Sequence, residues 1–144
     1  MNKFTSAIAA LAMIGSGLAS GTAMAQSGTY TGTAAVFKGI ALNCVVSADF
    51  DPLTSTVVLS ITAPEPNCGL LSIISNPHTY SVSGSTITVD DVNVNTITGG
   101  GCFDDLIATY DSVNDTVSVD DELTERDGGG NCFITSDGPL TLTP

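Results

Sequence analysis

Few residues of this sequence could carry out chemistry, and they form no recognisable group. The only histidine, His78, lies in the turn-like stretch Asn76-Pro77-His78, and the chain has no G-x-S-x-G or S-x-x-K motif. Nucleophilic catalysis needs a nucleophile beside a base that a third group orients. A lone histidine in a turn is ordinarily a surface residue. Trp, the usual sugar platform, is absent as well. We therefore expect no enzyme activity and no catalytic residue.

Acidic side chains occur in close groups, which suggests calcium binding. Calcium takes about six to eight oxygen ligands, but no stretch here matches an EF-hand loop or the glycine-rich nonapeptide repeat. The ordinary interpretation is an acidic, solvated surface at strand ends and turns, without a metal. If a calcium site exists, we expect Asp120, Asp121 and Glu122 to form it. The acidic groups are Asp49 with Asp51, Asp90-Asp91, Asp104-Asp105 and Asp120-Asp121-Glu122.

Two glycine runs, residues 99–101 and 128–130, superficially resemble phosphate-binding loops. Neither precedes a predicted helix or contains the lysine of a P-loop, so both are better interpreted as flexible turns. The formal net charge of −12 also repels phosphate. That charge excludes the basic surface of a nucleic-acid-binding protein and argues against attraction to anionic membranes. We expect no cofactor and no nucleic-acid partner.

The first 25 residues have the features of a secretory signal peptide. Lys3 precedes a short apolar run at residues 7–14, and Ala23-Met24-Ala25 is a typical cleavage site. The run is too short to span a membrane, which takes about 20 apolar residues. Cleavage leaves residues 26–144 as one small secreted domain with no membrane span, located in the periplasm or outside the cell.

Four cysteines lie in the exported part of the chain: Cys44, Cys68, Cys102 and Cys132. An even number of cysteines in an oxidising compartment predicts two disulfides. A zinc site is the competing interpretation. It is not favoured, because no two cysteines have the C-x2-C spacing and the chain has a single histidine.

Apolar and polar residues alternate through most of the exported part, and Val, Ile and Thr are frequent. This pattern predicts β-strands, and short strands with regular turns indicate a small antiparallel β-sandwich or a barrel-like domain. The chain is therefore assigned to the all-β class. We expect strands at residues 30–37, 40–48, 56–62, 79–83, 85–89, 92–97, 116–119 and 140–143.

An internal repeat indicates two related hairpin units. Residues 50–59 align without gaps on residues 110–119, sharing the order aromatic, Asp, any, aliphatic, two of any type, Thr, Val, any, aliphatic. Asp51 and Asp111 can each accept a hydrogen bond from the backbone two residues on, as in an Asx-turn. The repeat argues for a strand at residues 102–110, where the spacing of apolar residues would also fit a helix.

The hairpin interpretation predicts which side chains face each other. Residues 57, 59 and 61 should lie in the core opposite residues 46, 48 and 50. Each unit contains one early and one late cysteine, which predicts the disulfides Cys44–Cys68 and Cys102–Cys132. Pairing between the units remains open, because sequence alone does not fix connectivity.

The order of these motifs resembles a known family, the small secreted alkane-oxidation activator (PraB-like) proteins. The resemblance extends from about Lys38 to Leu142 and implies an extracellular accessory protein that promotes growth on hydrocarbons, as an emulsifying or matrix-associated protein without a known catalytic residue. It rests on Lys38-Gly39-Ile40-x-Leu42-x-Cys44, Cys68, the strand-rich residues 83–96, the glycine run before Cys102, and Cys132.

Our leading hypothesis is a non-enzymatic protein that acts at an extracellular interface, with a hydrocarbon surface or an extracellular matrix as its partner. A structural or adhesin-like subunit is one alternative: it would self-associate by strand addition, with residues 30–37 as the donated strand. A calcium-binding extracellular module is the other.

Overall fold

The computed structural model describes residues 27–62 and 64–143, and the predicted signal peptide lies outside these residues. The described chain is almost entirely β-structure, as the alternating pattern predicted. Its elements are β1 (Gly28–Lys38), β2 (Ile40–Asp51), β3 (Thr56–Thr62), the 3-10 helix η1 (Pro66–Leu70), β4 (Ser72–Ile74), β5 (His78–Ser83), β6 (Thr86–Asn95), β7 (Gly101–Asp111), β8 (Thr116–Leu123), β9 (Cys132–Ser136) and β10 (Leu140–Leu142).

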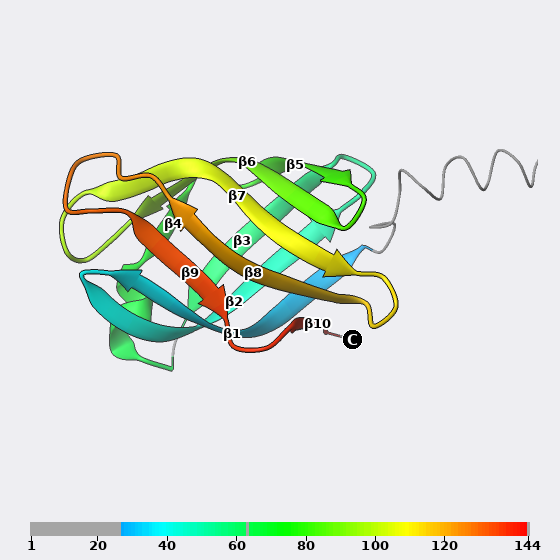
Figure 1. Cartoon of the computed structure of the whole chain (residues 1–144), viewed down its shortest axis with the longest axis horizontal. Helices are drawn as coiled ribbons and strands as arrows, with labels where there is room; N and C mark the ends of the chain where they lie inside the picture. Colours follow the sequence, from blue (N-terminus) through cyan, green and yellow to red (C-terminus); the bar gives the residue numbers. More distant parts are fainter. Residues whose placement is uncertain (1–26, 63, 144) are drawn as a thin grey trace, which may run out of the picture.

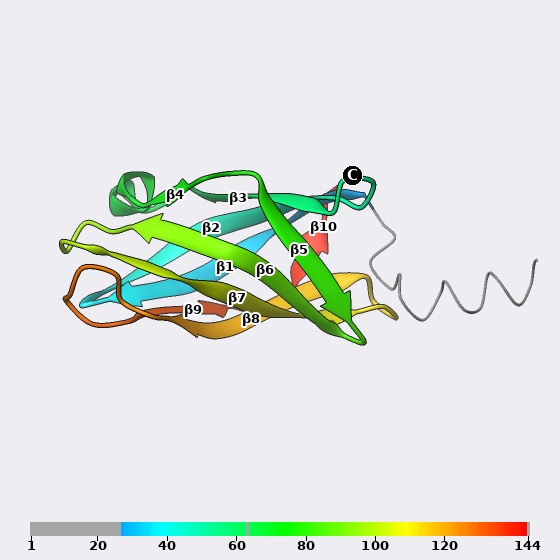
Figure 2. The same cartoon turned by 90° about the horizontal axis from the view of Figure 1, so that it is seen from above.

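The strands form a closed antiparallel barrel (Figure 1). Of the two predicted architectures, a β-sandwich and a barrel-like domain, the second is therefore confirmed. The ladder runs β1-β2-β3-β5-β6-β7-β8-β9, and β9 returns to pair with β1. β10 pairs with both β1 and β8, and β4 pairs with β6. β3 and β4 lie on one side of the barrel, and β8 and β9 lie on the opposite side (Figure 2). The barrel interior is therefore enclosed by strands from the whole length of the chain.

The two predicted hairpin units are β2–β3 and β7–β8. In the first unit, Val46 pairs with Ile61, Ala48 with Leu59 and Phe50 with Val57, which confirms the predicted facing residues. Strand alternation places every second side chain in the interior, and five of these six are buried, with Ile61 half-buried.

Both hairpin turns have the predicted Asx geometry. The Asp51 carboxylate accepts a hydrogen bond from the Leu53 N–H at 3.0 Å, and the Asp111 carboxylate accepts one from the Val113 N–H at 2.9 Å. The last residue of each turn has a left-handed backbone, with φ of 54° at Ser55 and 52° at Asp115. The repeat in the sequence is thus a repeat of turn chemistry.

An aromatic cluster fills the end of the barrel that carries these two turns. Phe50 and Tyr80 meet edge to face with ring centroids 5.0 Å apart, and Tyr30 contacts Phe50 at 5.8 Å and Tyr110 at 6.5 Å. The hydroxyls of Tyr30 and Tyr110 both donate to the Asp115 carboxylate. Burial, with this carboxylate as a further cause, raises the pKa of both phenols. These buried rings and their shared acceptor close this end.

Some local predictions need correction. Residues 85–89 and 92–97, expected as two strands, mostly fall in the single strand β6, whose register shifts between Val89 and Val92. Asp91 adopts φ 53° there, and its N–H donates to the Asp105 carboxylate on β7. The Asp90-Asp91 doublet therefore marks a bulge and not a turn. β4 and β9 were not predicted.

His78 also differs from the expectation of a surface turn. It begins β5, pairs with Val57 and is only 4% exposed. Tyr80, two residues further along β5, is also buried. Because alternate residues of a strand share a face, the side chains of His78 and Tyr80 both point inward. Its Nε2 has no hydrogen-bond partner in the described part of the chain.

Both edges of the segment proposed for strand addition are already occupied. Residues 30–37 pair with β2 along their whole length. On the other edge, Tyr30 and Thr31 pair with β10, and residues 34–37 pair with β9. Donation of this strand to another copy would require opening the barrel, which disfavours the adhesin-like alternative in the form predicted.

Candidate functional site

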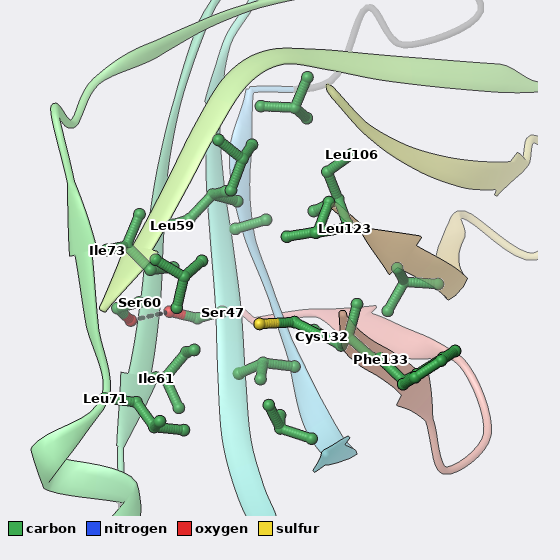
Figure 3. Close-up of a pocket in the computed structure, with 18 of the residues that line it drawn as sticks. Ser47, Leu59, Ser60, Ile61, Leu71, Ile73, Leu106, Leu123, Cys132 and Phe133 are labelled. Atoms are coloured by element: carbon green, nitrogen blue, oxygen red, sulfur yellow. Dashed lines mark hydrogen bonds between the residues drawn. The ribbon is translucent and has the colours of Figure 1, made fainter. Parts of the chain in front are cut away.

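The barrel interior contains an apolar cavity of about 90 Å³ (Figure 3). Its lining comes from nearly every strand and is dominated by aliphatic side chains. In Figure 3, side chains from the β3 and β4 side face those from β7, β8 and β9 across the space. The first group is Leu59, Ile61, Leu71 and Ile73, and the second is Leu106, Leu123 and Cys132.

The residue types at inward-facing positions explain why space remains. Ala48 on β2 and Ala108 on β7 are buried and line the cavity, and their single methyl groups reach less far than the Val, Ile and Leu side chains beside them. Much of the wall is β-branched, and such side chains have few rotamers with which to collapse inward. The cavity is therefore a preformed apolar space.

Among the described residues that line the cavity, Lys38 is the one titratable side chain. Strand alternation from Tyr30, Ala34 and Val36 carries it onto the inner face at the end of β1, where it is only 4% exposed. Its Nζ donates a 2.9 Å hydrogen bond to the Gly101 carbonyl. A lysine in this position is a polar feature at the edge of an otherwise apolar space.

The two glycine runs pack around Lys38, and they are turns as predicted. Gly99, Gly100, Gly128, Gly129 and Gly130 all have φ between 69° and 89°, which other residues rarely adopt. A Cβ on Gly129 would lie 3.4 Å from Lys38 Cε, and one on Gly100 would lie 3.1 Å from the Gly128 carbonyl oxygen. The close approach of these loops buries the lysine.

The disulfides are Cys44–Cys68 and Cys102–Cys132, which confirms the predicted pairing. Cys102–Cys132 joins β7 to β9 across the intervening β8, and the Cys132 sulfur points into the cavity in Figure 3. Cys44–Cys68 ties η1 to β2 within a small cluster that includes Leu42 and Leu71. Cys132 therefore belongs to the cavity lining, whereas Cys44 and Cys68 do not.

The three predicted calcium ligands are not brought together. The Asp120 carboxylate accepts from the Thr135 hydroxyl at 3.0 Å, and the Asp121 carboxylate accepts from the Ile107 N–H at 2.6 Å. The Glu122 carboxylate accepts from the Asn131 amide. Within residues 27–62 and 64–143, no group of three or more His, Cys, Asp or Glu is arranged to hold a metal ion. The calcium alternative has no ligand cluster there to support it.

Other acidic residues hold the backbone where strand ladders are interrupted. Asp104 accepts from both the hydroxyl and the N–H of Thr124. The Thr124 hydroxyl bond is the main cause that lowers the pKa of Asp104, with backbone hydrogen bonds adding to it and partial burial opposing it. The acidic groups of this chain thus include structural acceptors that sequence inspection could not separate from solvated charge.

Two aliphatic side chains project from the closed end of the barrel. Leu53 in the β2–β3 turn is 96% exposed, and Val113 in the β7–β8 turn is 90% exposed. They occupy equivalent positions in the repeat, and both turns lie at the same end of the molecule (Figures 1 and 2). We call Leu53 and Val113 the apolar tips.

Comparisons with known proteins give one positive finding. The sequence model of a protein family described as alkane oxidation protein activator PraA/PraB-like matches residues 1–144. No curated protein and no solved structure matches the chain. Within the described residues, no helix is long and apolar enough to cross a membrane.

Proposed function

Since the chain belongs to the alkane oxidation protein activator PraA/PraB-like family, we propose that it is a secreted, non-catalytic accessory protein that takes hydrocarbon molecules into its barrel interior. The cavity of about 90 Å³ is the observation that carries this proposal. An apolar cavity of about 150 Å³ in another protein stays dry and binds benzene. The cavity here is smaller, about 90 Å³, and its aliphatic walls suit the end of a short hydrocarbon chain.

The composition of the wall supports a non-catalytic role. Lys38 is the one titratable group on the lining of the cavity, so a bound alkane would meet C–H groups on nearly every side. Apolar contact of this kind binds a hydrocarbon but offers no oxidant for its C–H bonds. Oxidation is then the task of another protein, and this one increases access to the substrate.

The proposed place of action is the boundary between the hydrocarbon phase and water, outside the cytoplasm. Alkanes dissolve poorly in water, so a protein that collects them must meet them at the surface of the oil phase. The two disulfides suit an oxidising compartment. The predicted signal peptide, residues 1–25, would provide the route.

The test is a titration of n-hexane into methyl-labelled protein purified after export, followed by NMR. We expect the methyl signals of Leu106 and Leu123 to shift in a saturable manner, while those of Leu53 stay unchanged. Ala108→Val extends a side chain into the cavity and should weaken binding. Ala35→Val is the matched control, because Ala35 is exposed on the outer face of β1. Unchanged hexane affinity in Ala108→Val, or shifts at exposed methyl groups alone, would contradict the proposal.

A second candidate function, adsorption to oil droplets, is favoured by the apolar tips. Two almost fully exposed aliphatic side chains at one end could enter an oil surface without any change in the barrel. This function corresponds to emulsification. It depends on Leu53 and Val113, whereas hydrocarbon uptake depends on the interior, so the two are separable.

A further inference from the structure

The position of Lys38 indicates a more specific ligand than an alkane. We propose that Lys38 binds the carboxylate of a short aliphatic acid whose hydrocarbon chain lies in the cavity. The inference rests on the proposed function in one respect: both place an apolar chain in the same space. The Lys38 ammonium would then bind the carboxylate, a group that an alkane lacks.

The hydrogen bonding of Lys38 leaves capacity for such a ligand. An ammonium group has three N–H donors, and Gly101 accepts one of them. The ion pair of the described residues is Arg126–Asp127, so none of their carboxylates pairs with Lys38. A buried charge without a counter-charge is costly. A bound anion would remove this cost.

Two threonines lie with Lys38 on the polar part of the cavity lining. Thr96 and Thr98 line the cavity beside it. The Thr96 hydroxyl donates to the Gly100 carbonyl, and the Thr98 hydroxyl donates to the Lys38 carbonyl. Both hydroxyl protons are therefore committed to carbonyls, so the remaining N–H donors of Lys38 are the ones available to an anion. The aliphatic wall begins at once with Val36, Ile40 and Leu42, which would contact the hydrocarbon chain.

The charge balance selects a monoanion. A single lysine in a chain of net charge −12 is a weak site for a doubly charged phosphate. An alcohol would accept a hydrogen bond but leave the buried charge uncompensated. A carboxylate brings one negative charge and two acceptor oxygens, and an ammonium–carboxylate hydrogen bond is stronger than a neutral one. Aliphatic acids are also the class of compound that oxidation of a terminal methyl group produces.

The experiment compares hexanoate, 1-hexanol and n-hexane as ligands of the exported protein at neutral pH. Calorimetry should give the tightest binding for hexanoate. Lys38→Met should weaken hexanoate binding by about tenfold or more, the worth of a hydrogen bond to a charged group, and should leave n-hexane binding intact. Arg126→Met is the matched control, because it removes the same charge from a residue outside the cavity lining.

A second measurement does not depend on a variant. Lys3 and Lys38 are the only lysines, and cleavage of residues 1–25 would leave Lys38 alone. Lysine labelled with ¹³C at Cε should therefore give one signal in the exported protein. Hexanoate should shift this signal much further than n-hexane, which occupies the same space but does not pair with the ammonium group. A lysine with a purely structural role would respond to both ligands alike.

The outcomes separate this inference from the proposed function. Equal hexanoate affinity in Lys38→Met and wild type, or a Cε signal that hexanoate shifts no further than n-hexane does, would overturn the inference while n-hexane binding upheld the function. Hexanoate binding without n-hexane binding would uphold the inference and overturn hydrocarbon uptake. If Lys38→Met does not fold, the Cε signal decides.

Discussion

The hydroxyl of Tyr30 donates a 2.6 Å hydrogen bond to the carboxylate of Asp115, 85 residues further along the chain. Tyr110 donates to the same oxygen at 2.7 Å. Asp115 ends the β7–β8 turn, so one side chain links the first strand of the barrel to the second hairpin unit. The equivalent position of the first unit is Ser55, which has the same backbone conformation and no such role.

Replacing Asp115 should therefore destabilise the protein far more than replacing Ser55. Asp115→Ala leaves two buried hydroxyls without their acceptor, and we expect a loss of about 2–4 kcal/mol in the free energy of unfolding. Ser55→Ala imposes the same backbone conformation on alanine and should cost much less. Urea unfolding of both variants measures the difference. Similar losses in the two would show that turn strain, and not the tyrosine pair, is responsible.

The same cluster predicts a loss of stability in alkali. Burial raises the pKa of Tyr30, and the hydrogen bond to Asp115 adds to the shift. The unfolded chain releases the phenol proton near pH 10, whereas the folded chain retains it. The unfolded state therefore binds fewer protons above that pH, so stability falls as pH rises. Below pH 10 this group makes no pH-dependent contribution.

Tyr30→Phe should reduce this alkaline loss, because the variant has no phenol to ionise at that position. The measurement is the free energy of unfolding from urea titrations at several pH values on both sides of pH 10. Tyr80→Phe is a useful comparison, since burial also raises the pKa of Tyr80 but Asp115 does not contact it. A wild-type stability that stays level above pH 10 would contradict the expectation.

Local sequence patterns predicted the parts of the fold that local chemistry determines. Alternation predicted most of the strands, and the repeat predicted both hairpins, their Asx turns and the facing of Phe50 and Val57. The cysteine pairing followed from the same two units. Each of these features depends on residues that are close in sequence or on a pattern that occurs twice.

Features that depend on distant partners could not be predicted. The Asp90-Asp91 doublet looks like a turn until Asp105 of the neighbouring strand is seen to accept the Asp91 N–H. Closure of the barrel depends on β9, a short strand after a glycine run, meeting β1. The burial of Lys38 depends on two glycine loops that meet around it. The candidate site was therefore missed, although the inward position of residue 38 could have been inferred from the alternation of β1.

Asn76 strengthens the weakest join in the barrel. β3 and β5 share only two paired positions, and beyond them the Asn76 amide accepts from the Leu59 N–H at 3.0 Å and donates to the Leu59 carbonyl at 2.8 Å. Asn76→Ala should lower the free energy of unfolding by about 1–3 kcal/mol, since both backbone groups lose a partner. Asn67→Ala, at an exposed position of η1, is the control. Equal urea midpoints for the two variants would disprove this role.

The two disulfides should contribute similarly to stability and differently to the cavity. The linked cysteines are 24 and 30 residues apart, so the chain-entropy relation gives about 3–4 kcal/mol for each. Replacing either pair by alanine should lower the urea midpoint accordingly. Loss of Cys102–Cys132 should also change n-hexane affinity, because Cys132 lines the cavity and Cys44 and Cys68 do not. Identical hexane binding in both double variants would argue that the cavity in Figure 3 is not the binding site.

The apolar tips allow droplet adsorption to be tested without touching the interior. Burying an aliphatic side chain in an apolar phase is worth about 1.5–3 kcal/mol. The double variant Leu53→Ser, Val113→Ser should therefore have a partition coefficient for hexadecane droplets that is lower by about tenfold or more. Both side chains are almost fully exposed, so the urea midpoint should barely change. Leu70→Ser is the control, because Leu70 is 62% exposed but lies in η1, away from the tips.

If the double variant adsorbs like wild type, or if Leu70→Ser reduces adsorption equally, the tips do not direct the protein to oil. In either case n-hexane uptake should be unchanged, because Leu53 and Val113 are not part of the cavity wall.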